Sequence, residues 1–299
     1  MKKITFNGKE RTLKEWSEKL GVSYHTLYQR IYVKGMDLEQ ALGKHKRKTI
    51  RAVVIGDIHV PYQLDNLMDK IADVEDLDYI VIGGDLVDCE SCTSFPILER
   101  PSLEQELMKA HEFIKELIKR TGAKIKCIKG NHEERLEKEI MKMHTKGIQR
   151  MLDTQLLRML QDGFNFYENG RKVKYEPIEG FEYIDKWYAK LFDNLVVCHP
   201  KNFSNVPGKV AEQSAEHFLN KGIIDKDDVV FVQHTHKFSN IIASRRQDIF
   251  VIENGCACKP MEYADRGNLS YGSQVNCFTL IEFVEGEKID KNNIRTIFL

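Results

Sequence analysis

The chain lacks a long hydrophobic run. None of its apolar stretches approaches the roughly 20 residues that a membrane-spanning helix requires. The chain starts MKKITFNGKE, which has the basic residues of a secretory signal peptide but no apolar segment after them. We therefore expect no membrane partner and a cytoplasmic location.

A disulfide framework is not indicated either. The 299 residues include seven cysteines, an odd number, and Cys127, Cys198 and Cys277 lie in stretches that read as buried strands. Such cysteines suit reduced thiols in a reducing compartment. The sequence also lacks internal repeats and low-complexity segments, and its length fits one large domain or two unequal domains.

The chain has no net charge, but its charges are unevenly distributed. Residues 1–50 hold 12 Lys and Arg against 5 Asp and Glu, which leaves 33 against 40 for the rest of the chain (45 − 12 and 45 − 5). A basic head on a mildly acidic body predicts two modules with different partners. We place the boundary between residues 1–48 and residues 49–299.

Residues 12–42 show the pattern of three short helices. Thr12 and Glu15 have the spacing of a capping box, and Ser23 is a second N-cap after a tight turn. The pattern resembles the helix-turn-helix segments attached to phage and mobile-element endonucleases. The resemblance implies a small all-α helix-turn-helix domain over residues 1–48.

DNA is the partner that we expect for this domain. Its second helix would enter the major groove, and the basic run after the third helix would neutralise phosphates. The residues expected to contact DNA are Tyr24, Tyr28, Gln29, Arg30, Lys44, Lys46, Arg47 and Lys48. Two alternatives stay open, namely a domain for protein contacts and a basic run that is only a solvated linker.

Strands and helices alternate after Thr49, which indicates an α/β domain. The predicted strands are 51–56, 78–83, 124–129, 195–198, 229–233, 249–253, 276–284 and 293–298, and the clearest helices are 64–75 and 102–120. The end of the chain is therefore expected to be dominated by strands. His111, His144 and His217 lie on helical stretches, where we expect them to be solvated.

Five of the predicted strands end in residues that can bind a metal. In chain order these are Asp57 and His59, Asp85 and Asp88, Asn131 and His132, His199, and finally His234 and His236. Ligands of open α/β sheets bind at loops outside the carboxyl ends of the strands. Each motif alone has another explanation, such as a helix cap, a surface histidine or alternating strand residues.

Taken in order, the five motifs resemble those of the calcineurin-like metallophosphoesterases, over roughly residues 50–299. The resemblance implies a sandwich of two mixed β-sheets flanked by helices, with a two-metal centre at one edge. It assigns Asp57, His59, Asp85 and His236 to one metal, and Asp85, Asn131, His199 and His234 to the other. It also makes His132 the general acid or transition-state stabiliser and Asp88 the residue that orients it.

This ligand set predicts the cofactor and the reaction. Imidazole and carboxylate ligands suit Mn, Fe, Zn or Ni better than Ca or Mg, and Mn²⁺ is the first expectation. Two such ions activate water for displacement at phosphorus. We expect a phosphodiesterase, first of all a DNA nuclease. The alternatives are a phosphomonoesterase acting on nucleotides or phosphoproteins, and a DNA-binding regulator with a silent phosphoesterase fold.

Two departures from the family pattern bear on the substrate. Gln233 stands where the family usually has glycine, and Cys89 follows Asp88 where the protein phosphatases carry Arg-Gly. The missing arginine argues against a phosphoprotein phosphatase. Residues that could replace it are Lys201, Lys237, Arg245 and Arg246.

Two further patterns are hypotheses. Residues 134–192 form a long connection with interleaved basic and aromatic residues, which suits a substrate cap for a nucleic-acid strand, although a charged helical face is the alternative. Cys89, Cys92, Cys256 and Cys258 could form a four-thiolate zinc site, with free thiols as the alternative.

Overall fold

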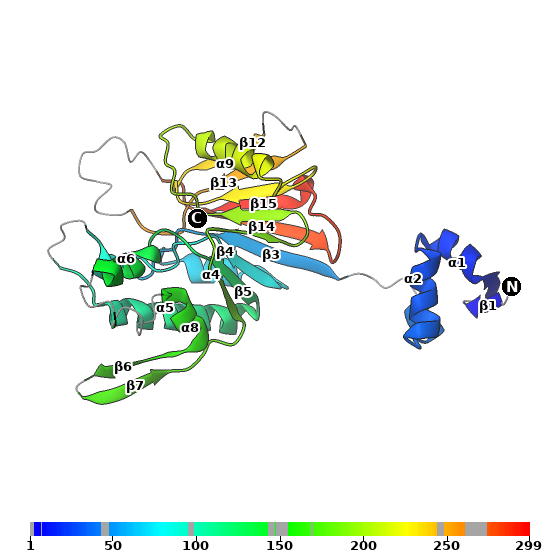
Figure 1. Cartoon of the computed structure of the whole chain (residues 1–299), viewed down its shortest axis with the longest axis horizontal. Helices are drawn as coiled ribbons and strands as arrows, with labels where there is room; N and C mark the ends of the chain where they lie inside the picture. The colour runs from blue at the N-terminus through cyan, green and yellow to red at the C-terminus, as the bar shows by residue number, and fades with distance from the viewer. Residues whose placement is uncertain are drawn as a thin grey trace. The chain divides into compact units, whose positions relative to one another are not determined.

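The protein consists of two compact units, residues 1–48 and residues 49–299 (Figure 1). The computed structural model describes residues 3–6, 8–42, 48–94, 99–142, 147, 155–168, 170–243, 248–260 and 274–299. Within these ranges, no helix has the length and apolar character needed to cross a membrane.

The N-terminal unit combines a β-hairpin with short helices. Its elements are β1 (Lys3–Phe6), β2 (Lys9–Thr12), α1 (Leu13–Leu20), α2 (Tyr24–Tyr28), the π-helical turn η1 (Gln29–Val33) and α3 (Leu38–Leu42). The prediction of an all-α domain is therefore wrong. Ile4 and Phe6 alternate with polar residues and bury one face of the hairpin against Trp16, whose indole N–H donates to the carbonyl of Ile4 at 3.0 Å.

The predicted helix starts of this unit are confirmed. Thr12 and Glu15 form a capping box, in which the Thr12 N–H donates to Glu15 at 2.7 Å and the Glu15 N–H donates to the Thr12 hydroxyl at 3.3 Å. Ser23 accepts from the N–H of Thr26 at 3.1 Å at the start of α2. Leu27 of α2 is fully buried in the small hydrophobic core of this unit.

Two mixed sheets form the larger unit (Figure 1). One has the strand order β15-β14-β3-β4-β5-β8, and the other has the order β12-β13-β11-β10-β9. The strands of the first are β3 (Thr49–Ile55), β4 (Tyr79–Ile82), β5 (Lys124–Ile128), β8 (Phe181–Ile184), β14 (Cys277–Val284) and β15 (Ile294–Phe298). Those of the second are β9 (Tyr188–Leu191), β10 (Leu195–Cys198), β11 (Val229–Val232), β12 (Phe238–Ile242) and β13 (Phe250–Asn254).

The sheets pack face to face. Along β3, Ala52 and Val54 point into a core shared with β10, β11 and β13, whereas Val53 and Ile55 point into the core beneath the helices. This alternation is the period of two that a strand buried on both faces shows. The predicted sandwich of two mixed sheets is confirmed.

Helices cover both outer faces. They are α4 (Leu67–Ala72), α5 (Leu103–Thr121), α6 (Glu134–Lys142) and α8 (Leu156–Asp162) on the six-stranded side, and α9 (Lys209–Asn220) on the other. The larger unit also has two 3₁₀ turns, η2 (Glu90–Cys92) and η5 (Lys291–Asn293). Helix α9 was not predicted, although Val210, Ala211 and Phe218 bury one helical face against the five-stranded sheet.

The region expected to form a cap is only partly separate from the sandwich. Strands β8 and β9 belong to the two main sheets, which leaves α6, α8 and the hairpin β6 (Phe164–Glu168) to β7 (Arg171–Tyr175) outside them. The hairpin packs on α5 through His111, which is buried rather than solvated. The ring of His111 contacts the ring of Tyr175 edge-on at 5.0 Å, and its Nε2 lies 2.9 Å from the carbonyl of Glu176. His217 is exposed as expected, and His144 lies outside the described residues.

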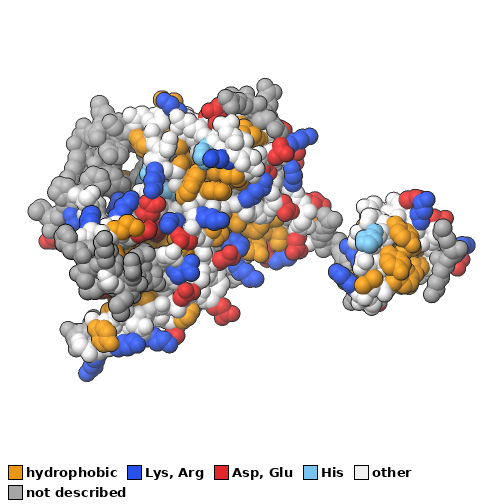
Figure 2. Space-filling view, viewed as in Figure 1, with side chains coloured by type: hydrophobic (Ala, Val, Ile, Leu, Met, Phe, Trp, Pro, Cys, Tyr) orange, Lys and Arg blue, Asp and Glu red, His pale blue; other side chains and the backbone are white. Residues whose placement is uncertain are grey.

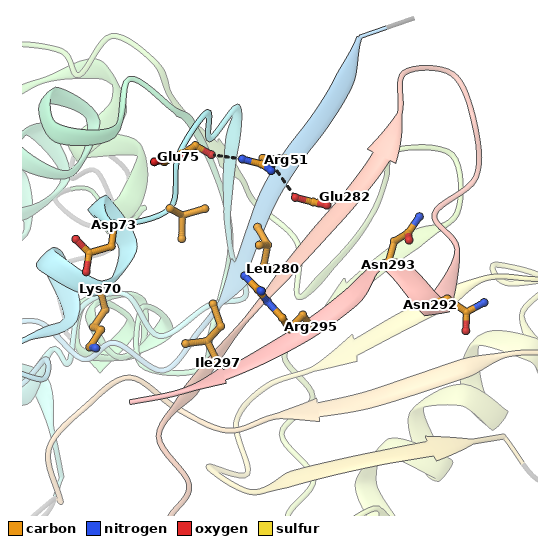
Figure 3. A pocket seen from close by; sticks show the side chains of 11 residues that line it. Arg51, Lys70, Asp73, Glu75, Leu280, Glu282, Asn292, Asn293, Arg295 and Ile297 are labelled. Carbon is orange, nitrogen blue, oxygen red and sulfur yellow. Dashed lines mark hydrogen bonds and ion pairs between the residues drawn. The ribbon is translucent and has the colours of Figure 1, made fainter.

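A pocket of about 720 Å³ lies over β14 and β15 beside α4 (Figure 3). Two of its charged lining residues pair with each other, because Arg51 contacts Glu282 at 2.7 Å; Arg51 also donates to the backbone carbonyl of Glu75 at 3.0 Å. None of the predicted metal ligands lines this pocket. The predicted ligands lie instead at the edge of the sandwich where the strands end.

Candidate metal centre

The predicted ligands all follow the carboxyl ends of parallel strands. Strands β3, β4 and β5 are parallel neighbours in one sheet, and β10 and β11 are parallel neighbours in the other. Their loops carry Asp57, His59, Asp85, Asp88, Asn131, His132, His199, His234 and His236. Because parallel strands end at the same edge of a sheet, both sheets contribute loops to a single site.

The backbone of these loops is unusual. Asp57, His59 and Asp85 have φ of 50°, while His234 has 86° and His236 has 56°. Non-glycine residues in this left-handed region cost of order 1–3 kcal/mol each and persist where neighbours fix them. Here the loops fix one another, since the N–H of Asp57 donates to the carbonyl of Gly84 at 3.1 Å and that of His59 to the carbonyl of Asp85 at 3.0 Å.

Asp57, His59 and His236 form what we call the first half-site, together with Asp85. His236 Nε2 lies 3.3 Å from Asp57 Oδ1 and 3.3 Å from His59 Nε2. His59 Nε2 lies 3.8 Å from Asp85 Oδ2. Four side-chain atoms that could bind a metal, contributed by three loops, therefore lie close together.

Asp85, Asn131, His199 and His234 form the second half-site. His199 Nε2 lies 3.2 Å from Asp85 Oδ2 and 3.1 Å from Asn131 Oδ1. The ligand atoms of Asp85, His199 and His234 all lie within 4.8 Å of one another. Asp85 Oδ2 faces both half-sites, which is the position that a shared ligand requires. His199 Nδ1 lies 2.8 Å from the carbonyl of Gly83, so the ring is held with Nε2 toward the centre.

Asp88 holds two imidazoles rather than one. Its Oδ1 lies 3.0 Å from His132 Nδ1, the contact expected for a residue that orients His132, and 2.9 Å from His59 Nδ1. Its carbonyl also accepts from His132 Nδ1 at 2.7 Å. Burial would raise the pKa of Asp88, but hydrogen bonds from His132 and His59 hold it well below its usual value. Asp88 therefore stays ionised and fixes both rings.

Arg135 is a residue of this site that the sequence did not single out. From the first turn of α6, its Nη1 donates to the carbonyl of Asp88 at 3.0 Å, and its Nη2 lies 2.9 Å from His132 Nε2. A guanidinium only donates, so His132 Nε2 accepts and the proton of a neutral His132 ring is on Nδ1. The guanidinium thus brings a fixed positive charge to the side of the centre where His132 lies.

Glu133 fastens the loops together. Its carboxylate accepts four backbone N–H groups, those of Asp85 at 3.2 Å, Leu86 at 2.7 Å, Val87 at 3.1 Å and Gly130 at 2.9 Å. Burial and the nearby Asp85 carboxylate raise the pKa of Glu133 to about 7, against the pull of those donors. Its place as the fourth residue of Gly-Asn-His-Glu was the only sequence signal for this role.

The buried charges of the centre depend on one another. Burial would raise the pKa of Asp85, but the imidazoles of His199 and His132 hold it well below its usual value. Burial lowers the pKa of His199, but the Asp85 carboxylate outweighs this and raises it to about 9. Burial and the charge of His199 lower the pKa of His234 to about 4. Protonated imidazoles thus balance the carboxylates of this centre.

The donor set fits divalent transition-metal ions. Asp57 Oδ1 is buried and accepts no hydrogen bond from the described residues, although it faces His59 and His236. A buried carboxylate oxygen is costly unless a positive charge faces it. Without metal, the protonated ring of His236 at 3.3 Å supplies that charge, and a bound cation would supply it in place of the ring proton. Imidazole nitrogens, carboxylates and one amide oxygen are suitable ligands for Mn, Fe, Zn and Ni.

The cysteines do not form the four-thiolate site considered above. All seven are free thiols, and Cys89 packs in the core beneath α5 while Cys256 and Cys258 pack together against Tyr62. Among the described residues, the clusters with metal-ligand spacing include Cys258 but neither Cys89 nor Cys92.

The residues predicted to contact DNA belong to the N-terminal unit. Tyr24 and Tyr28 are exposed, and their rings stack at 6.3 Å. Gln29 and Arg30 are half-buried, and Arg30 donates to the carbonyl of Ala41 at 3.4 Å. Lys48, the last residue of the unit, is exposed. Lys44, Lys46 and Arg47 lie outside the described residues, as do Arg245 and Arg246 in the larger unit.

Solved structures similar to this chain are distant. They include an archaeal phosphodiesterase (14% identity, 84% of this chain and 100% of that chain, TM-score 0.36) and a Thermotoga maritima protein solved by NMR (12%, 84% and 99%, 0.30). A protein of Thermus thermophilus is similar at 11% identity, with 84% and 99% covered and a TM-score of 0.32. Likeness of this degree carries no argument about activity. No curated protein matches the chain.

The model of the family described as calcineurin-like phosphoesterase matches residues 50–270. That range covers most of the 299 residues and contains every side chain of both half-sites, from Asp57 to His236. With this match over a sandwich that gathers carboxylates and imidazoles at one edge, the chain belongs to the calcineurin-like phosphoesterase family, whose members are metal-dependent hydrolases.

Proposed function

We propose that the protein is a two-metal phosphodiesterase, and specifically a DNA nuclease that the N-terminal unit brings to its substrate. The observation that carries the proposal is the position of Asp85 Oδ2, which lies 3.8 Å from His59 Nε2 and 3.2 Å from His199 Nε2. One carboxylate oxygen thus faces both half-sites. When bound, the two cations supply Lewis-acid activation of water and of the phosphoryl oxygens.

The chain's own residues provide the remaining parts of the reaction. Asp57 and Asp85 carry negative charge, Asn131 is a neutral amide ligand, and the histidines are neutral ligands once cations replace the protons of the charged rings. A centre that keeps a surplus of positive charge attracts a phosphate ester. Arg135 adds a guanidinium on the side of His132. We propose that this side receives the leaving oxygen, with Asp88 holding the ring of His132 in place.

A second candidate function is a phosphomonoesterase, and Arg135 is the observation that favours it. Cys89 occupies the place where protein phosphatases carry an arginine, and its side chain is fully buried. Arg135 reaches the same loop from α6 and donates to the carbonyl of Asp88. A guanidinium there could hold two of the three non-bridging oxygens of a monoester through paired hydrogen bonds, and a monoester leaves one more such oxygen than a diester for the metal side. Lys201 is less suited, because it pairs with Glu134 at 2.6 Å.

The proposal for DNA rests on the N-terminal unit. Residues 1–50 carry a surplus of basic residues, 12 against 5. Figure 2 shows exposed hydrophobic side chains on this unit, and Tyr24, Tyr28 and Tyr32 are among its exposed aromatic residues. The ring centroids of Tyr24 and Tyr28 lie 6.3 Å apart, and those of Tyr28 and Tyr32 lie 5.1 Å apart. Aromatic side chains beside basic ones suit contact with nucleic-acid bases and phosphates.

We also propose that the protein is located in the cytoplasm, because its seven cysteines are free thiols and free thiols persist there.

Four substrates separate these activities. The protein is incubated with Mn²⁺ and either bis-p-nitrophenyl phosphate, p-nitrophenyl phosphate, linear duplex DNA or single-stranded DNA. The proposal expects hydrolysis of the diester and of at least one DNA. Strong turnover of the monoester without DNA cleavage would replace it with the second candidate.

A separate comparison tests DNA targeting. The affinity for DNA of the whole chain is measured against that of a chain that begins at Thr49, over a series of salt concentrations. Loss of the N-terminal unit should weaken binding and reduce the salt dependence, because phosphate contacts release counterions. Equal affinity and equal salt dependence would remove DNA targeting from the proposal and leave the hydrolase in place.

A further inference from the structure

A Cys-x-Cys segment borders the first half-site. Cys256 and Cys258 follow strand β13, and both side chains are fully buried. The Sγ of Cys258 lies within 4.8 Å of the ligand nitrogens of His59 and His236, and these three atoms form a cluster with metal-ligand spacing. Neither the sequence motifs nor the family resemblance assigned these thiols to the centre. They stand beside the half-site that also contains the buried Oδ1 of Asp57, which faces His236 Nε2 at 3.3 Å.

The backbone places this segment firmly. The N–H of Ala257 donates to the carbonyl of Asp57 at 3.1 Å, and the carbonyl of Ala257 accepts from the N–H of Leu64 at 3.0 Å. The carbonyl of Cys258 accepts from Asn276 Nδ2 at 2.8 Å and from Gln274 Nε2 at 2.8 Å. The thiol of Cys258 is therefore held beside Asp57 by a built network rather than by a free loop.

The two thiols have different surroundings. The Sγ of Cys256 lies 3.4 Å from Asn276 Nδ2, and Cys256 lies close enough to His236 to raise the pKa of that ring. Cys258 instead faces the ligand nitrogens of two histidines. Only Cys258 is in the position of a further ligand.

We propose that Cys258 supplies a thiolate ligand to the cation of the first half-site. The inference rests on the proposed two-metal centre. Binding releases the proton of the Cys258 thiol to solvent and forms a sulfur–metal bond, with no change in oxidation state. A thiolate beside imidazoles favours softer cations. The first half-site should therefore select Zn²⁺, Fe²⁺ or Co²⁺ over the Mn²⁺ expected from the oxygen and nitrogen ligands alone.

Cobalt provides a readout that does not depend on activity. The whole chain is stripped with a chelator under reducing conditions and titrated with Co²⁺, while bound metal and the near-ultraviolet absorption are both recorded. A thiolate bound to Co²⁺ gives an intense charge-transfer band, whereas oxygen and nitrogen ligands do not. The variants are Cys258→Ser, Cys256→Ser and, as the control, Cys198→Ala. Cys198 is a buried thiol whose side chain packs in the core between the five-stranded sheet and α9.

The expected result is a band in the wild type, in Cys198→Ala and in Cys256→Ser, and its loss in Cys258→Ser. Two bound cobalt ions without any band would overturn the thiolate ligand and leave the two-metal centre standing. Failure to bind cobalt at all would instead overturn the proposed function. A band that depends on Cys256 and survives in Cys258→Ser would overturn the assignment to Cys258.

The Cys258→Ser variant is checked for folding by circular dichroism before it is interpreted. X-ray absorption of the zinc-loaded wild type provides a test that needs no variant. A sulfur neighbour at about 2.3 Å from zinc supports the proposal, and a shell of oxygen and nitrogen alone contradicts it.

Discussion

Replacement of Glu133 by glutamine tests whether the loops of the centre depend on a single carboxylate. Glu133 Oε1 accepts the N–H groups of Leu86 and Val87, and its Oε2 accepts those of Asp85 and Gly130. A glutamine of the same shape keeps one oxygen and turns an NH₂ group toward the other two donors. Those two N–H groups then lose their acceptor in a fully buried place.

The size of the effect follows from these contacts. A buried N–H that loses its acceptor costs about 1–3 kcal/mol, so two of them cost about 2–6 kcal/mol. The free energy of unfolding of a typical domain is about 5–15 kcal/mol, so the variant should fold but be markedly weakened. Asp85 and Asn131 sit on the loosened loops, so we also expect metal affinity to fall by roughly 10–100-fold.

Urea denaturation of the metal-free protein at pH 8 measures the loss of stability, and metal retention after dialysis measures the second effect. The pH is above the pKa of Glu133, which is about 7, so the carboxylate is charged in the wild type. Because that pKa is raised, the buried charge itself costs stability at pH 8, and the loss on substitution should lie toward the lower end of this range. Glu134→Gln is the matched control, because Glu134 pairs with Lys201 and Lys138 near the surface and should change stability by less than about 1 kcal/mol. If Glu133→Gln behaves like this control in both measurements, the carboxylate does not hold the loops.

Three further substitutions test separate parts of the site. Asp85→Asn should reduce the number of divalent cations retained and abolish hydrolysis, because its Oδ2 faces both half-sites; metal analysis showing full loading together with full turnover would contradict a shared ligand. Arg135→Lys should lower diester turnover by roughly 10–100-fold at unchanged metal content, because an ammonium group lacks the fork that reaches His132 Nε2 and the carbonyl of Asp88 together; unchanged kcat would contradict a role for the fork. Gln233→Met should raise the free energy of unfolding by about 1–3 kcal/mol in urea, because neither polar atom of the buried carboxamide has a hydrogen-bond partner among the described residues; a loss of stability would show that the carboxamide has one.

The sequence predicted the sandwich and the grouping of its loops because both follow from local patterns. Buried strands alternate between two faces, and polar ligands directly after such strands lie at the edge where parallel strands end. The end of β3 shows this directly, since Val54 faces the opposite sheet while Asp57 lies at the edge. The structure brings Asp57, His199 and His236 together although about 180 positions separate the first from the last.

What the sequence did not predict depends on contacts between distant parts of the chain. Arg135 looks like any basic residue in the first turn of a helix, and only the packing of α6 places it on His132. Strands of four residues such as β1 carry too short a pattern to separate from a loop, which is why the N-terminal unit was taken as all-α. The two cysteines after β13 have a spacing that suits no common zinc motif. Their position beside the centre depends on the backbone hydrogen bond from the Ala257 N–H to the Asp57 carbonyl.

Loading the centre with cations must displace protons, and the number displaced depends on Cys258. Burial lowers the pKa of His236, but Cys256 and Asp57 outweigh this and raise it well above its usual value, while the pKa of His199 is about 9. At pH 7 both imidazoles are therefore protonated without metal, and both must lose a proton to become ligands. The hydrogen bond to Cys256, together with burial, raises the pKa of Cys258, so a thiolate ligand there releases one proton more.

These protonation states fix the sign of the pH dependence. Because raised pKa values favour the protonated, metal-free form at low pH, metal affinity should rise from pH 6 toward pH 9 and fall as the pH is lowered. Calorimetric titration with Zn²⁺ at pH 7, in buffers of different ionisation enthalpy, counts the protons released. His199→Gln and Cys258→Ser should each reduce the count by one relative to the wild type. An identical heat in every buffer would contradict the protonated imidazoles, and a count that Cys258→Ser leaves unchanged would contradict the thiolate ligand, because a sulfur that binds the cation cannot keep its proton.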